Sequence, residues 1–223
     1  PPTDWCQLFL PEIDPGQIPT DQPPRYNIAP TQSVFCVFRE SAGGPTEVMR
    51  ARWGLVPPWA KELSIGNRMI NARGETVDTK PSFRNAVAKR RCLIPCDGFY
   101  EWKKLADGKQ PYLIEPSTGT LLAMAGLWEE NKKIAQDGAA IRTCTIITTQ
   151  ANQAMSELHH RMPVFVGRDD WGQWLDPAFR DTSTLKKRLT PAPDDLLQMT
   201  AVSRYVNSPK NDDKKCTQPA DVA

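Results

Sequence analysis

The sequence predicts an α+β fold in a single domain, with mainly antiparallel strands and short helices between them. Proline is abundant, with 21 residues against 13 glycines in a chain of 223, and this favours extended, turn-rich connections over long helices. Strand-like runs follow one another without the regular alternation of strand and helix that a parallel sheet requires. The length suits one domain with a sizeable core, so we predict a single domain over residues 1–223.

The first ninety residues are expected to supply three extended segments and one helix. Residues 1–10 suit a short helical turn, and the Pro-rich residues 11–33 suit an irregular connection. The extended segments, predicted from their β-branched and aromatic side chains, span 33–39, 48–56 and 69–73. Residues 82–90 suit the helix.

The rest of the chain is expected to alternate between strands and short helices. The predicted strands span 91–95, 98–104, 111–115, 121–128, 142–149, 162–166 and 199–206. The predicted helices span 150–157, 169–175 and 182–188. Residues 207–223 are polar, and we expect a loop and a loose C-terminal tail there.

The charge balance narrows the classes of partner. The net charge is only +2, so affinity for nucleic acid would have to come from a local basic patch. No apolar run is long enough to span a bilayer, and residues 1–10 lack the basic region typical of a signal peptide. We therefore expect a cytoplasmic protein with no membrane partner, associated with the nucleoid if the source is bacterial.

Six cysteines are spread along the chain, and most lie beside apolar residues. This pattern is typical of buried, reduced thiols in a cytosolic protein. Cys92 and Cys96 are four positions apart, but no second cysteine pair and no nearby histidine complete a zinc site. We expect neither a metal nor a cofactor.

Five short segments combine polar or ionisable residues with proline, glycine or aromatic residues in a way that a core strand does not need. They are RYNIAP at 25–30, RWGLVPPWA at 52–60, INARGET at 70–76, DGFYEW at 97–102 and LHHRMP at 158–163.

Acid–base chemistry is indicated by a glutamate and a histidine pair within these segments. Glu101 lies between two aromatic residues, a setting that suits a general acid, although a strand-edge glutamate that reaches water fits the pattern better on these grounds alone. His159 and His160 are the only two histidines, and imidazole suits proton transfer near neutral pH. A surface pair is equally compatible with the sequence.

Nucleic-acid binding is indicated by aromatic and cationic residues from several segments. Asn71 and Arg73 share a face if their segment is extended, although a structural asparagine and a surface salt bridge would look the same. Bases stack on aromatic rings and phosphates meet guanidinium groups, but tryptophans are more often core residues. The relevant side chains are Trp53, Trp59, Trp102, Arg25, Arg52, Arg73, Arg84 and Arg161.

Taken in order, the five segments resemble the SRAP family, the SOS-response-associated peptidase-like proteins that process abasic sites. The resemblance runs from about residue 25 to about residue 210 and includes AVSRYVNSPKND at 201–212. It implies curved, barrel-like antiparallel sheets around a cleft for single-stranded DNA. It also implies an N-terminal cysteine that forms a Schiff base and then a thiazolidine cross-link with the abasic aldehyde, with lyase activity and self-removal of the initiator methionine.

The resemblance also assigns roles to residues. Asn71 is similar to the family asparagine that positions the N-terminal cysteine, Glu101 to the acid–base glutamate, and His159 to the histidine that assists Schiff-base chemistry and strand release. His160 occupies a variable position. The residues that the resemblance and the composition place at DNA are Arg73, Arg161, Pro30, Trp59, Trp102, Asn27, Trp53, Arg84 and Thr148.

One departure concerns the start of the chain, because the family begins Cys-Gly-Arg and the sequence here begins with Pro1 and Pro2. Cys6 cannot substitute, since it has no free α-amine. We expect a short stretch before Pro1 that carries the cysteine.

Two other functions remain open. One is a non-covalent module for single-stranded DNA or DNA junctions. The other, a peptidase acting on other proteins, is less favoured because no internal nucleophile has an obvious histidine and acid partner. The expected partner is single-stranded DNA with abasic sites, possibly at junctions, and the expected state is a monomer.

Overall fold

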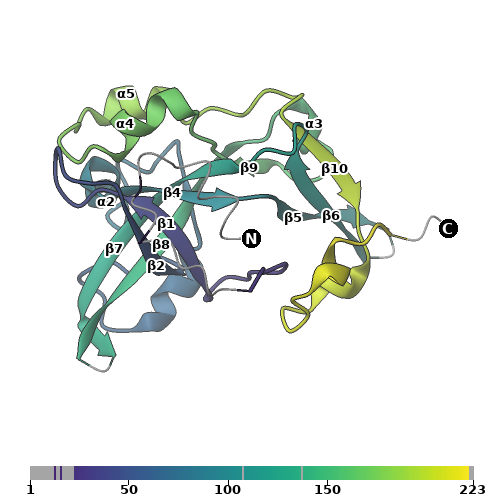
Figure 1. The fold of residues 1–223 in the computed structure, drawn as a ribbon, viewed down its shortest axis with the longest axis horizontal. Coiled ribbons are helices and arrows are strands. Elements are labelled where there is room, and N and C mark those ends of the chain that lie inside the picture. The colour runs from purple at the N-terminus through teal and green to yellow at the C-terminus, as the bar shows by residue number, and fades with distance from the viewer. Residues whose placement is uncertain (1–12, 14–15, 17–22, 107, 137, 221–223) are drawn as a thin grey trace.

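A closed barrel of five strands forms the centre of the fold (Figure 1). The computed structural model describes residues 13, 16, 23–106, 108–136 and 138–220. The barrel strands are β1 (Ser33–Phe38), β2 (Glu47–Trp53), β4 (Arg91–Cys96), β7 (Leu122–Gln136) and β8 (Ala139–Gln150). Their order is β2-β1-β4-β7-β8, and a parallel pairing of β2 with β8 closes the ring. The predicted barrel-like α+β fold is confirmed.

Strand β8 carries two further short strands beyond the point where it closes the barrel. Arg52 and Trp53 of β2 pair with its first part. β3 (Asn71–Arg73) pairs in parallel with residues 146–148, and β9 (Arg161–Pro163) pairs in antiparallel fashion with residues 148–150. Three of the segments singled out from the sequence therefore meet along one strand.

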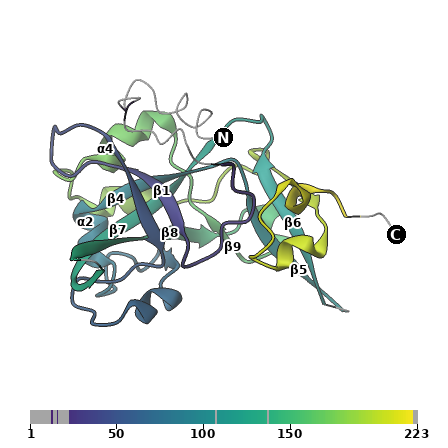
Figure 2. The ribbon, with the colours of Figure 1, turned by 60° about the horizontal axis from the view of Figure 1, so that its bottom comes forward.

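A second, three-stranded sheet lies beside the barrel in both views (Figures 1 and 2). Its order is β10 (Leu197–Ala201), β6 (Gly108–Pro116) and β5 (Phe99–Leu105). A core cluster built from β6, β7, β9, β10 and the helix α3 (Gln153–Ser156) joins this sheet to the barrel. Its buried members are Ile114, Leu122, Met155, Met162 and Leu197.

The helices are short and peripheral. The α-helices besides α3 are α2 (Arg84–Lys89), α4 (Trp171–Leu175) and α5 (Thr182–Lys187). The 3-10 helices are η2 (Leu63–Arg68), η3 (Arg168–Asp170), η4 (Arg204–Asn207) and η5 (Lys214–Thr217). None of the helices in the described part of the chain is both long and apolar enough to cross a membrane.

The barrel strands bury both of their faces, because successive side chains of a strand point to opposite sides. Val37 and Leu93 point outward to the cluster that contains Trp174 of α4 and Leu185 of α5. The alternate residues form a second cluster, with Cys36, Phe38, Cys92, Trp128 and Cys144 among its members. Since the helices cover the outside, this second cluster fills the barrel. The three cysteines are free and buried, as predicted.

A buried arginine of β4 connects the barrel to the helices through hydrogen bonds. Arg91 is 2% exposed, and its guanidinium donates to the carbonyls of Val87, Trp174, Asp176 and Phe179. Burial lowers the pKa of Arg91 to about 10, so the group is still charged at neutral pH. Four backbone carbonyls, at helix ends and in one loop, thus accept hydrogen bonds from a single guanidinium group.

The C-terminal segment differs from its prediction. The strand expected over 199–206 ends at Ala201, and residues 204–207 form η4. Residues 207–220 are packed against the fold: Cys216 is buried, and the backbone amide of Ala220 donates to Ala201. The loose tail predicted over 207–223 is therefore wrong for 207–220. Residues 221–223 and the predicted helical turn at 1–10 lie outside the described residues.

The hairpin of β7 and β8 is longer than predicted. Strands were expected over 121–128 and 142–149, whereas the two strands reach residues 136 and 139. The added part is rich in lysine, glutamate and asparagine, which are depleted in strands. Pairing within the hairpin outweighs that preference, with an irregular register between Asn131 and Gln136.

Replacing Arg91 tests whether its hydrogen bonds stabilise the packing of the helices on the barrel. We expect Arg91→Met to lower the free energy of unfolding by about 3–5 kcal/mol, because several buried carbonyls lose their donor together. The measurement is urea unfolding followed by fluorescence. Arg84→Met, at an exposed position of α2, should stay within about 0.5 kcal/mol of the parent. A loss below about 1 kcal/mol in Arg91→Met would contradict the assignment.

Candidate active site and nucleic-acid interface

An acid–base pair joins the small sheet to the segment that precedes β9. Glu101 lies in the middle of β5, and its Oε2 is 3.7 Å from Nδ1 of His159. The side chains are 26% and 37% exposed, so both are open to a substrate. The strand turns Glu101 away from its neighbours Tyr100 and Trp102. Tyr100 instead donates its hydroxyl to the carbonyl of Tyr26.

The ring of His159 has a backbone partner in either neutral tautomer. Its Nδ1 lies 3.1 Å from both the amide nitrogen and the carbonyl oxygen of Arg161. Nδ1 can therefore accept a hydrogen bond when bare or donate one when protonated. A backbone partner at Nδ1 in each neutral tautomer suits a proton-transfer group.

The two adjacent histidines face different surroundings. Their ring centroids are 4.4 Å apart. His159 meets Glu101, whereas His160 is exposed and lines an open hollow of about 570 Å³. The other lining residues are Arg73, Gln150, Ala151, Ser156 and Arg161. Only His159 therefore lies next to Glu101, and the functional role expected for it stays a prediction.

Arg161 is held by both an acidic side chain and the barrel strand. Its guanidinium forms a bidentate salt bridge with the Glu75 carboxylate, at 2.7 and 2.9 Å, and donates to the carbonyl of Thr148 at 2.6 Å. The pair holds the pKa of Glu75 below its ordinary value, chiefly through these hydrogen bonds. Thr148 is buried, and its hydroxyl lies 3.3 Å from the same guanidinium.

The residues of β3 present a polar face. Asn71 and Arg73 are exposed while Ala72 between them is buried, so the predicted shared face is confirmed. Arg73 pairs with Thr148 in the sheet register and lines the same hollow as Arg161. The loop after β3 is held by Lys186, which contacts Asp78 and the carbonyl of Glu75. Two arginines thus share one open surface.

The aromatic candidates are placed in three different ways. Trp59 is a large apolar side chain that is 52% exposed at the surface. Trp102 donates its indole N–H to Asn207 and keeps part of its ring exposed. Trp53 is partly buried in the barrel cluster and donates to the carbonyl of Ile70. Exposed Pro30 precedes Thr31, whose backbone amide donates to Trp53.

Two of the expected DNA contacts lie apart from this surface or beneath it. Arg84 is exposed at the start of α2, and the structure brings it into no contact with the hollow. Asn27 is 6% exposed, and its amide nitrogen donates to the carbonyls of Val206, Ser208 and Asn211. The structure gives Asn27 a structural role, because its donor group is bonded inside the protein, and the expected DNA contact of Asn27 stays a prediction.

Sequence reasoning missed two acidic residues that support the site. Glu75 pairs with Arg161. The only sequence feature that could have indicated this role is the position of Glu75 within the segment INARGET. Asp212 accepts from the backbone amides of Tyr26 and Asn27 and pairs with Arg25. Neither contact follows from spacing, because the partners are far apart in the chain. Among the described residues, no three His, Cys, Asp or Glu side chains are grouped to hold a metal.

Comparison with known proteins identifies the family of the chain. A family model described as SOS response associated peptidase (SRAP) matches residues 9–209. The chain belongs to the SRAP family. This confirms the resemblance found in the sequence, and the match includes the segments that carry Glu101, Arg161 and β3.

Relatives in the SRAP family come from distant organisms. The chain is 43% identical to "Abasic site processing protein YoaM" of Bacillus subtilis, over 84% of this chain and 82% of that protein. It is 35% identical to "Abasic site processing protein HMCES" of Gallus gallus, over 89% and 67%. A solved protein of Bacteroides thetaiotaomicron matches with a TM-score of 0.73 at 26% identity, over 85% and 82%. A phage-related protein of Bordetella bronchiseptica matches with a TM-score of 0.70 at 27% identity, over 91% and 90%.

The structural role of Asn27 can be tested by removing its amide. We expect Asn27→Ala to lower the free energy of unfolding by about 2 kcal/mol, since three carbonyls lose a donor, and to speed hydrogen exchange over 206–216. Asn85→Ala, at an exposed position of α2, is the matched control. Unchanged stability together with weaker DNA binding would restore the contact role for Asn27.

The ion pair of Glu75 predicts a pH-dependent contribution to stability. Its pKa is lower in the folded protein, so the contribution is complete above the ordinary value of about 4.3 and is lost as the pH falls through the lower folded value. Glu75→Gln should therefore cost at most about 1 kcal/mol at pH 7, because the carboxylate is 45% exposed. The difference should vanish in acid. Glu47→Gln serves as control, and a gap that persists to the lowest pH would contradict this origin.

Proposed function

We propose that this chain processes abasic sites in single-stranded DNA through a covalent thiazolidine cross-link. The observation that carries the proposal is the Glu101–His159 pair, 3.7 Å apart and open to solvent, beside the surface with Arg73 and Arg161. Family membership supports it, as do the names of the relatives, which are called abasic site processing proteins. The chemistry needs acid–base groups next to a strand-binding surface, and both are close together here.

The covalent step uses both nucleophiles of an N-terminal cysteine. Its α-amine adds to the aldehyde carbon of the ring-opened abasic sugar, and the resulting carbinolamine loses water to give an imine. The thiol sulfur then adds to the imine carbon, its proton passes to the nitrogen, and the five-membered ring closes. This step requires the N-terminal Cys-Gly-Arg that the family resemblance implies.

Glu101 and His159 serve the proton transfers in this scheme. Loss of water from the carbinolamine needs an acid that protonates the departing hydroxyl, and amine attack needs a base that takes up a proton. Glu101 supplies the acid and base at the reacting carbon. His159, held in place in either tautomer, exchanges protons at the imine and assists strand release. Asn71, exposed on β3, positions the α-amine.

The strand would bind through phosphate contacts and stacking. Arg73 and Arg161 meet the phosphates, with Thr148 behind Arg161. Exposed Pro30 and Trp59 and partly buried Trp102 stack on or wedge between bases. Trp53, partly buried in the barrel cluster, supports β3 by donating to the carbonyl of Ile70. Such contacts tolerate any base sequence, as a lesion-processing protein requires. Strand cleavage at the imine stage and self-removal of the initiator methionine belong to the same proposal.

A second candidate function is non-covalent binding of single-stranded DNA or DNA junctions. The surface with Arg73 and Arg161 favours it, because phosphate binding there needs no cysteine. Loss of the cross-link would leave this function intact.

The experiment is intact mass spectrometry of the protein, made from its full reading frame, after mixing with single-stranded DNA that carries one abasic site. We expect an adduct that survives denaturation and is absent with undamaged DNA or after loss of the N-terminal cysteine. Glu101→Gln and His159→Gln should each slow its formation by about 10²-fold. His160→Gln is the matched control, because His160 lines the hollow and does not contact Glu101; at saturating DNA it should react at the parental rate. DNA binding without any adduct would leave only the second candidate.

A further inference from the structure

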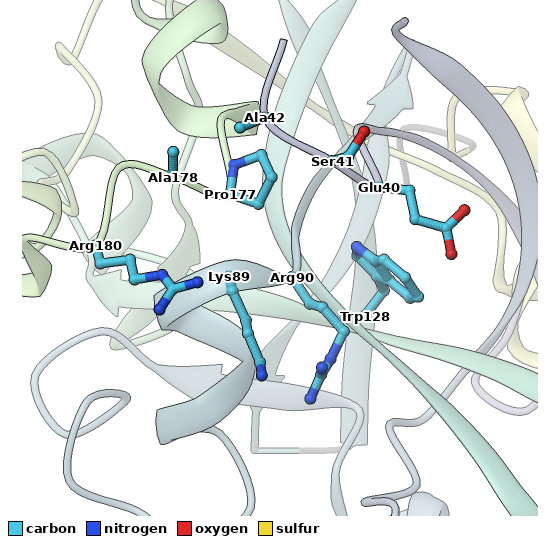
Figure 3. A pocket seen from close by; sticks show the side chains of 9 residues that line it. All are labelled: Glu40, Ser41, Ala42, Lys89, Arg90, Trp128, Pro177, Ala178 and Arg180. Atoms are coloured by element: carbon cyan, nitrogen blue, oxygen red, sulfur yellow. The ribbon is translucent and has the colours of Figure 1, made fainter. Parts of the chain in front are cut away.

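A second hollow lies away from the acid–base site, at the end of the barrel where the β1–β2 turn, the end of α2, β7 and the 177–180 segment meet (Figure 3). Its volume is about 390 Å³. It is lined by Glu40, Ser41, Ala42, Lys89, Arg90, Trp128, Pro177, Ala178 and Arg180. None of these residues contributes to the surface with Arg73 and Arg161, and the proposed function makes no use of them.

The lining is predominantly cationic. Lys89 and Arg180 supply two positive charges, and Glu40 is the one carboxylate of the lining. The third cation, Arg90, is paired with the buried carboxylate of Glu129. The Glu40 carboxylate forms a salt bridge with Arg142, with 4.0 Å between Oε1 and Nη2. In Figure 3 the Arg180 side chain extends from its segment toward Lys89. No acidic side chain in the described chain forms a salt bridge with either Lys89 or Arg180. The hollow therefore attracts an anion.

Two hydrogen-bond donors at this hollow have no acceptor among the described residues. Trp128 is 5% exposed, and its indole Nε1–H has no hydrogen-bond partner. The Nε–H of Arg90 also has no hydrogen-bond partner. The indole nitrogen of Trp128 is turned toward the space beside Arg90 and Pro177 (Figure 3). Buried donors almost always have a partner. Four other tryptophans follow that rule by donating to a carbonyl: Trp53, Trp171 and Trp174 to the backbone, and Trp102 to a side chain.

The donors are held rigidly. The Trp128 ring packs edge-on against Phe38 at 5.1 Å, and the Arg142 guanidinium lies 5.7 Å from its centroid. The backbone amide of Trp128 donates to the carbonyl of Arg90, which ties β7 to the end of α2. Arg90 is fixed at its other end by Glu129, at 2.6 Å. Donors fixed in advance and shielded from water bind an anion more strongly than mobile surface groups do.

We propose that this hollow is a binding site for a phosphate group. The Nε–H of Arg90 and the Nε1–H of Trp128 donate to its oxygens, and Lys89 and Arg180 balance its charge. A tetrahedral oxyanion suits donors that approach from different sides better than a planar carboxylate does. The phosphate belongs either to a small phosphorylated molecule or to the backbone of a DNA strand.

The test uses the indole N–H resonances of the ¹⁵N-labelled full chain, with Trp128 assigned through a Trp128→Phe variant. Addition of inorganic phosphate at constant ionic strength should shift the Trp128 resonance with saturation. The Trp174 resonance, whose N–H is bonded to Cys92, should stay in place. The exposed double variant Lys89→Gln/Arg180→Gln should weaken binding at least about tenfold.

A parallel titration with an undamaged single-stranded oligonucleotide identifies the source of the phosphate. A shift with both ligands supports the site and assigns it to a DNA strand, while a shift with inorganic phosphate alone supports a small phosphorylated ligand. No Trp128 shift with either ligand, or an equal shift in the double variant, overturns the proposal. Because the double variant leaves Glu101 and His159 untouched, its abasic-site adduct should form at the parental rate at saturating DNA. This result separates the phosphate site from the proposed function.

Discussion

The hydrogen bonding of strand β8 on both of its edges is the constraint on which the rest of the structure depends. One strand pairs with β7 and β9 in antiparallel fashion and with β2 and β3 in parallel. The parallel pair closes the barrel, and the next residues along the strand carry β3 and β9. Thr148 is the point where these strands meet. Barrel closure and placement of Arg73 and Arg161 are therefore consequences of a single register, and a shift of that register would separate the arginines.

The acid–base pair depends on a second contact, the one between the barrel and the small sheet. Glu101 belongs to the small sheet and His159 to the segment that leads into the barrel, so their 3.7 Å separation reflects how the two parts pack. The apolar cluster between them contains Met155 and Met162, which flank His159 in the chain. Apolar burial at this junction thus fixes the distance between two polar groups at the surface.

Much of this arrangement could be predicted from sequence, and the failures have physical causes. Runs of β-branched and aromatic residues predicted the strands of the barrel, and the spacing of Asn71 and Arg73 predicted the shared face of β3. The family resemblance singled out Glu101 and His159, which local patterns alone left open. Local patterns could not predict Asn27, whose amide serves carbonyls about 180 positions away in the chain, or the pairing of Glu75 with Arg161. The polar end of the β7–β8 hairpin was missed because cross-strand pairing outweighs residue preference there. The packed segment 207–220 was missed because its contacts are made by the backbone and by single polar side chains.

The contacts of Asp212 have a consequence for how the protein is made. Its carboxylate accepts from the amides of Tyr26 and Asn27, which lie 186 and 185 positions earlier in the chain. During synthesis, the segment that carries Pro30 is therefore fixed only after residues up to 212 have left the ribosome. Contacts of such long separation form late, since the entropy of closing the loop must be overcome first. A nascent chain that stalls before this point has the barrel strands, but its segment around Pro30 lacks the anchor that Asp212 provides.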